Sequence, residues 1–74
     1  MATLFSEIKK INSNITLVNK DLYFIDTGTN IIHVKKELKH TNVIVLDSDT
    51  FEFVFDKNLK FNREVIEVIK KYIS

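Results

Sequence analysis

Apolar residues along this chain recur with two periods, one typical of helices and one typical of strands. Near the N-terminus, residues 4, 5, 8 and 11 are apolar at helical spacing, and Thr3 is placed to cap the first turn. Residues 63–73 carry six apolar side chains on one broad face and charged side chains on the other. The six are Val65, Ile66, Val68, Ile69, Tyr72 and Ile73. The pattern therefore predicts a helix at each end of the chain.

Between these helices, short apolar runs rich in β-branched and aromatic residues alternate with polar turn residues. Residues 15–18 and 22–25 predict a first hairpin, and residues 42–56 predict a second one around the turn Asp-Ser-Asp-Thr. The only glycine, Gly28, follows the first hairpin, so a turn with a positive φ is expected there. Each hairpin supplies two strands of an antiparallel sheet.

Three details of the strand region are less regular. Residues 30–40 fit both periods, and we predict a strand over 31–34 that leads into a helical turn over 35–39. Residues 56–58 are polar and are expected to form a turn before the last helix. Phe51, Phe53 and Phe55 alternate along the second hairpin, which predicts that all three lie on one face of their strand.

Together these elements predict an α+β fold. It consists of a small antiparallel sheet of four to five short strands, built from consecutive hairpins and flanked by an N-terminal and a C-terminal helix. Residues 1–74 are expected to form a single compact domain, since a chain of this length has one core. Cysteine is absent, so neither disulfides nor a cysteine-based zinc site can supplement that core.

Sequence patterns and composition indicate the compartment in which the protein acts. The N-terminal sequence MATLFSEIKK has no apolar run after its charges, and no apolar stretch approaches the length that spans a bilayer. We therefore expect a cytoplasmic protein with no membrane partner. Ten isoleucines, ten lysines and seven asparagines, with a single arginine, are associated with coding by an A/T-rich genome, such as that of a phage or mobile element.

One segment is similar to a catalytic motif. The sequence VIVLDSDTF, residues 43–51, resembles the strand and Asp-x-Asp by which haloacid-dehalogenase-type phosphatases hold phosphate and magnesium. The pattern departs from that family at Phe51, where the family has Thr or Val. Residues 57–74 are also too few to hold its later lysine and acidic motifs. We therefore interpret Asp47 and Asp49 as turn residues whose carboxylates accept hydrogen bonds from local backbone amides.

The histidines, His33 and His40, have no Ser, Cys or Glu at a spacing that indicates a nucleophile–base pair or a set of metal ligands. We interpret them as surface or strand-face residues. Small ribonuclease-like toxins are comparable in length, but they carry far more arginine. We therefore expect a protein that is not an enzyme and that needs no cofactor or metal, and a small nuclease-like toxin or other enzyme is the second alternative.

Lysines give the first alternative, a small nucleic-acid-binding protein. Lys9, Lys10, Lys35, Lys36 and Lys39 could converge on one face and neutralise phosphates. The formal net charge is only +1, however, and a reader of base edges generally carries several arginines. Lysines on the outer faces of helices are more often simply solvated.

The favoured function follows by exclusion. We predict a small non-enzymatic protein-interaction module, of the kind that phages and mobile elements use to bind and mask a host protein. The candidate contact residues are Asp47, Asp49 and Glu52 in the acidic turn, together with neighbouring exposed aromatic side chains. The expected partner is a host protein, and a second copy of the chain, forming a homodimer, is also considered.

Overall fold

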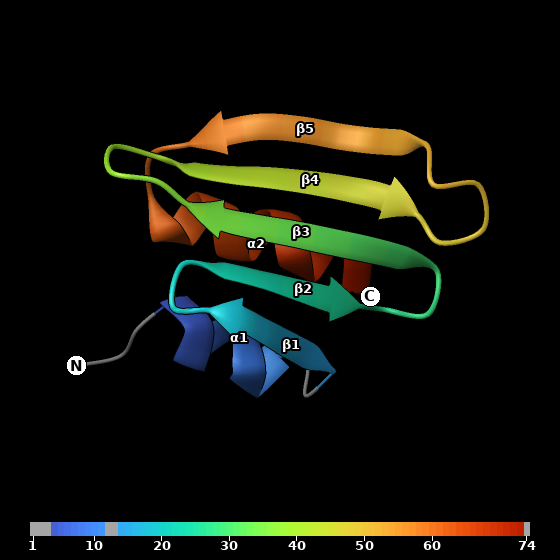
Figure 1. The fold of residues 1–74 in the computed structure, drawn as a ribbon, viewed down its shortest axis with the longest axis horizontal. Coiled ribbons are helices and arrows are strands. Elements are labelled where there is room, and N and C mark those ends of the chain that lie inside the picture. The colour runs from blue at the N-terminus through green and yellow to red at the C-terminus, as the bar shows by residue number, and fades with distance from the viewer. Residues whose placement is uncertain (1–3, 12–13, 74) are drawn as a thin grey trace.

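The computed structural model describes residues 4–11 and 14–73, and the predicted cap at Thr3 lies outside them. One helix, five strands and a second helix follow one another along this part of the chain (Figure 1). They are α1 (Leu4–Ile11), β1 (Ile15–Asn19), β2 (Leu22–Asp26), β3 (Asn30–Lys36), β4 (Thr41–Asp47), β5 (Phe53–Leu59) and α2 (Asn62–Ile73). The predicted α+β fold is confirmed, with five strands in the sheet.

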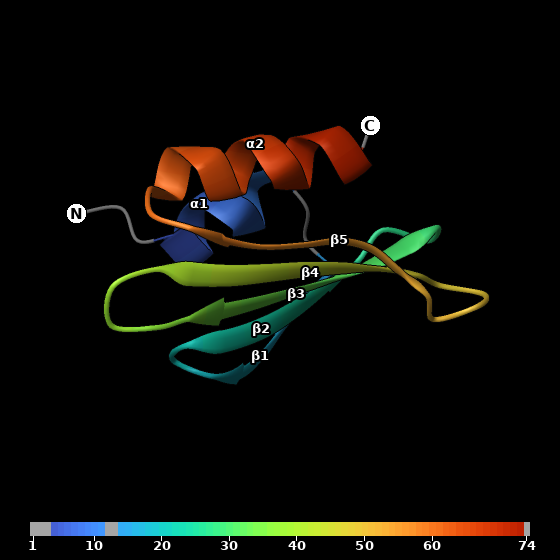
Figure 2. The ribbon, with the colours of Figure 1, turned by 90° about the horizontal axis from the view of Figure 1, so that it is seen from above.

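The strands form one antiparallel sheet in the order in which they occur along the chain, so each pairs with its sequence neighbours. Figure 2 shows both helices on the same face of this sheet, which we call the inner face. Strand alternation directs apolar side chains of β2, β3 and β4 to that face, where they meet the buried stripe of each helix. The buried apolar residues are Leu4, Ile8, Tyr23, Ile25, Ile32, Val34, Val43, Val45, Val65 and Ile69.

Two predicted turns are wrong, because strand pairing overrides local preference there. The helical turn expected over 35–39 is absent: β3 continues to Lys36, which pairs with Thr41, and the amide of Glu37 donates to the carbonyl of His40 at 2.8 Å. The turn expected over 56–58 lies inside β5. There the Asn42 side chain on β4 donates to Asn58 at 2.9 Å, so cross-strand bonds hold these polar residues extended.

The prediction that three phenylalanines share one face is also wrong. Phe55 pairs with Val45, but Phe53 pairs with Leu46, so the register shifts by one residue between these pairs. Val45 and Leu46 are consecutive and point to opposite faces, hence Phe55 lies on the inner face and Phe53 on the outer face. Phe51 precedes the strand altogether. Of the three rings, that of Phe55 packs against the core.

Within residues 4–11 and 14–73, neither helix combines the length and the apolar character that crossing a membrane requires.

Candidate functional site

Two turns lie side by side at one end of the sheet. One joins β2 to β3 and contains Gly28, whose φ of 93° confirms the predicted left-handed position. The other joins β4 to β5 over residues 48–52. The amide of Ser48 donates to the carbonyl of Thr29 at 3.1 Å, and the Ser48 hydroxyl donates to the carbonyl of Gly28 at 3.3 Å. The β4–β5 turn is therefore supported by its neighbour.

Asp47 holds the β4–β5 turn together. Its carboxylate accepts hydrogen bonds from the amides of Asp49 at 2.8 Å and Thr50 at 3.1 Å, as predicted for a turn aspartate. These bonds, with that from Thr50 the stronger influence, hold the pKa of Asp47 below its usual value. The same interpretation of Asp49 is wrong: Asp49 lies in the turn and its amide donates to Asp47, but its own carboxylate is exposed to solvent, as is that of Glu52. Among the described residues, no cluster of three His, Cys, Asp or Glu side chains could hold a metal ion.

Phe51 sits in this turn with a strained backbone. Its φ of 59° is in the left-handed region, which aromatic residues rarely adopt. A hydrogen bond of 2.8 Å from its amide to the Asp47 carbonyl closes the turn. The ring is 62% exposed, and that of Phe53 is 66% exposed. Asp47, Asp49, Phe51, Glu52 and Phe53 together form what we call the tip, an acidic and aromatic end of the sheet.

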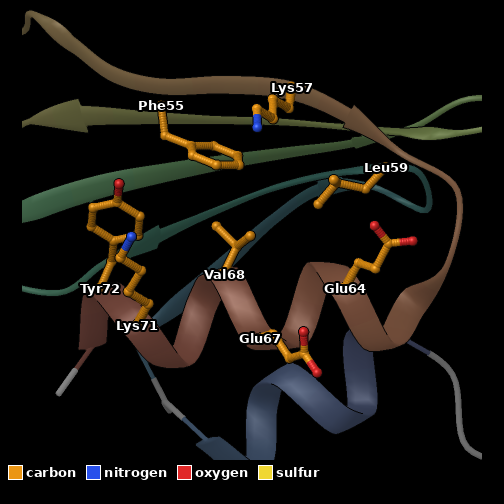
Figure 3. A pocket seen from close by; sticks show the side chains of 8 residues that line it. All are labelled: Phe55, Lys57, Leu59, Glu64, Glu67, Val68, Lys71 and Tyr72. Carbon is orange, nitrogen blue, oxygen red and sulfur yellow. The ribbon is translucent and has the colours of Figure 1, made fainter.

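A groove of about 290 Å³ runs from the tip side of β5 along helix α2 (Figure 3). Phe55 and Leu59 of β5 and Val68 of α2 line its apolar floor. The rings of Phe55 and Tyr72 meet edge to face, with 6.3 Å between their centres. The groove exists because α2 returns along the inner face beside the last strand of the sheet, and no further strand of the described chain fills that side.

Charges in this groove are separated along its length. The Lys57 ammonium lies 5.9 Å from the centre of the Phe55 ring, and the Lys71 ammonium lies 5.8 Å from the centre of the Tyr72 ring. Both cations therefore flank the aromatic pair. Glu64 lines the opposite end of the groove, beside Leu59 (Figure 3). Glu67 also lines the groove, on α2 between Glu64 and Lys71, and Lys57 lies between Phe55 and Leu59 (Figure 3). The carboxylates therefore lie toward the end where the chain enters α2, and Lys71 lies toward the tip.

Within the described chain, the outer face of the sheet carries no helix (Figure 2). Phe24, His33 and Ile44 stand opposite one another on adjacent strands and are half-buried by their neighbours. The rings of Phe24 and His33 lie 5.0 Å apart, and His33 Nδ1 has no hydrogen-bond partner among the described residues. Burial, helped by the charge of Lys35, lowers the pKa of His33 below 6.5, so the ring is neutral at physiological pH. This histidine packs as a largely apolar side chain.

The structure distributes the candidate lysines over separate surfaces. Lys9 and Lys10 are exposed in the last turn of α1, on the side of the sheet that the helices cover. Lys35 and Lys36 are consecutive in β3 and point to opposite faces, near the end of the sheet away from the tip. Lys35 forms an ion pair with Glu37 at 3.4 Å. Lys39 is exposed in the turn between β3 and β4. These side chains do not form one basic face.

Comparisons with protein families, with characterised proteins and with solved structures give no match to this chain. The acidic turn was identified from the sequence by its aspartates. The groove was not, because Phe55, Lys57 and Leu59 meet α2 only through the tertiary packing. Lys57 carried a usable signal: a lysine flanked by the apolar positions of a strand marks a sheet edge.

Proposed function

We propose that this protein is a non-enzymatic protein-interaction module that acts by covering a surface of a larger protein. The conformation of Phe51 carries the proposal. A left-handed backbone costs a non-glycine residue on the order of 1 kcal/mol, yet folding gains little from a ring that is 62% exposed. The turn needs a residue in this conformation, but it does not need an aromatic one, and strained positions are concentrated at functional sites.

The surroundings of Phe51 suggest the chemistry of its partner. Asp49 and Glu52, both exposed, flank the ring in the turn, and the equally exposed Phe53 lies on the outer face next to it. An aromatic anchor ringed by negative charge is complementary to an apolar pocket with a basic rim. We infer that the partner presents such a pocket and that the acidic side chains speed encounter with it.

The setting is proposed from composition. Residue usage associated with A/T-rich coding supports an accessory protein of a phage or mobile element, acting in the cytoplasm on a host protein. A small chain of this kind would act sterically, by occupying a surface that the host protein needs. The homodimer considered from the sequence would use a different surface, the apolar outer face around Phe24 and Ile44.

A pair of phenylalanine variants tests the proposal. Phe51 and Phe61 are both 62% exposed but lie at opposite ends of β5, so Phe61 is a matched control. Phe51→Gly relieves the left-handed strain and should leave the melting temperature unchanged or slightly raised. In affinity capture from a lysate of the host cell, Phe51→Gly should lose the dominant captured protein, and Phe61→Ala should retain it.

Nuclease treatment completes this experiment. A captured protein that survives nuclease and depends on Phe51 supports the proposal. Capture of material that vanishes with nuclease would instead favour nucleic-acid binding, and equal capture by Phe51→Gly and Phe61→Ala would remove Phe51 from the site.

A further inference from the structure

β5 is an open edge of the sheet. It pairs with β4 on one side, and within the described chain no strand pairs with its other side (Figure 1). Its seven residues therefore present a row of backbone N–H and C=O groups that can pair with another chain. β1, at the opposite edge, has only five residues, and its register shift between Leu17 and Asn19 interrupts most of its length. The register shift in β5 lies near its start, so residues 55–59 pair regularly with β4.

The inward side chains of β5 determine what such a strand would meet. Phe55, Lys57 and Leu59 alternate on the inner face, opposite Val45, Val43 and Thr41. A strand added beside β5 would direct every second side chain into the groove against α2, because alternation continues across a sheet. Those side chains would meet an apolar floor with Lys71 at the end nearer the tip, Lys57 in the middle, and the carboxylates of Glu64 and Glu67 toward the other end.

A second copy of this chain fits the edge poorly. In a two-fold antiparallel pair, residue i faces residue j and residue j faces residue i. Full overlap of β5 with itself places Asp56 opposite Asp56, and the register that pairs residues 55–59 places Lys57 opposite Lys57. The register that pairs residues 53–57 runs across the bulge at Val54, where β5 is irregular. Like charges directly opposite one another destabilise a strand pair.

We propose that β5 and the groove beside α2 bind an extended segment of the partner protein as an added antiparallel strand. The segment carries a basic, an apolar and an acidic side chain at alternate positions, in that order from its N-terminus to its C-terminus. The inference rests on the proposed function, since the segment belongs to the protein that the tip contacts. The tip and β5 are continuous, so one partner can reach both.

The charge order follows from the direction of the strands. An antiparallel segment begins beside Leu59, where Glu64 receives its basic side chain, and its apolar side chain then lies over Val68. It ends beside the aromatic pair, where Lys57 and Lys71 receive its acidic side chain. A parallel segment would need the reverse order. All four strand pairs of this sheet are antiparallel, and antiparallel pairing is slightly the more stable.

Peptide selection against the intact protein tests the proposal even while the partner is unidentified. Random peptides long enough to span β5 would be displayed and selected on the immobilised chain. We expect enriched peptides to share the basic–x–apolar–x–acidic order, and a bound peptide to shift the amide resonances of residues 53–59 and 64–72. In an added strand, every second peptide N–H faces β5 and the others face solvent. N-methylation at the positions that face β5 should abolish binding, and N-methylation at the positions between them should preserve it.

A charge-swapped variant tests which end of the groove receives the basic side chain of the segment and which receives the acidic one. Glu64→Lys combined with Lys71→Glu keeps the net charge, and far-UV circular dichroism checks its fold. The selected peptide should bind this variant about tenfold more weakly, and a peptide with reversed charge order should bind it better than it binds the original chain. If the variant does not fold, the comparison of the two peptide orders on the original chain remains decisive.

Several outcomes would overturn the inference. These are the absence of any enriched peptide, enrichment of the reversed order on the original chain, or shifts confined to Phe24 and Ile44 on the outer face. A dimer in sedimentation whose contact maps to β5 would make a second copy the occupant and would equally refute it. If capture depends on Phe51 while no peptide engages β5, the proposed function stands and only this inference fails.

Discussion

Replacing Phe53 and Phe55 separately by alanine tests the register shift that divides the tip from the core. A phenylalanine ring buries about 200 Å² when fully covered, and each Å² of apolar surface contributes about 25 cal/mol. Phe53, which is 66% exposed, buries only about a third of that area, so its removal costs at most about 1.7 kcal/mol. Phe55 packs against the core and Tyr72, and its removal costs about 3.5 kcal/mol.

These costs are large for a protein of this size. A chain of 74 residues has a free energy of unfolding of about 4–11 kcal/mol, so Phe55→Ala removes a third or more of it. Thermal melts followed by circular dichroism should show a drop of about 20 °C for Phe55→Ala and of less than about 10 °C for Phe53→Ala. Equal drops would mean that both rings lie on the inner face, and the assigned register would be wrong.

Three further perturbations have expected outcomes. Burial lowers the pKa of His33, so the unfolded chain takes up the proton first and stability should fall as the pH drops below 6.5. In thermal melts, His33→Gln should abolish this loss of stability and His40→Gln should retain it. Gly28→Ala should lower the free energy of unfolding in urea by about 1 kcal/mol because of the φ of 93°, although a Cβ there would meet no neighbouring atom. An unchanged urea midpoint would contradict the left-handed turn. Backbone hydrogen bonds lower the pKa of Asp47, so its carboxylate contributes stability above pH 3.8 that is lost as the pH falls further; the stability difference between the original chain and Asp47→Asn should shrink over that range.

The fold could be predicted where local signals and packing agree. The helical period of residues 63–73 requires one face to be buried, and α2 buries Val65 and Ile69 against the sheet. The first hairpin and the turn at Gly28 were predictable because turn chemistry is local. In each of these elements, the residues that determine the structure lie within a few positions of one another.

The errors came from pairing between distant residues. Lysines and glutamate over 35–39 favour a helix in isolation, but hydrogen bonding of Lys35 and Lys36 to β4 extends the strand. The extra residue Val54 in β5 shifts the register and places Phe53 on the outer face, while Phe51 lies in the turn before the strand. No local pattern reveals such a shift, because either register places aromatic residues in a strand.

The candidate site was predictable in part for the same reason. Asp47, Asp49 and Glu52 were recognised as an acidic turn, and the structure shows that Asp47 stabilises the turn while the other two face solvent. The strain at Phe51 depends on the backbone angle that the turn imposes, which the residue type does not reveal. The groove joins charged residues of β5 and α2. Their arrangement along the groove is set when α2 packs beside the edge strand, so the sequence alone does not show it.

Hydrogen exchange of the protein with its captured partner tests most directly the claim that the tip and β5 form the binding surface. The amides of residues 49–59 should exchange more slowly in the complex, while those of β1 and of the outer face around Phe24 should keep their rates. Protection confined to β1 or to the outer face, with residues 49–59 unchanged, would contradict the account.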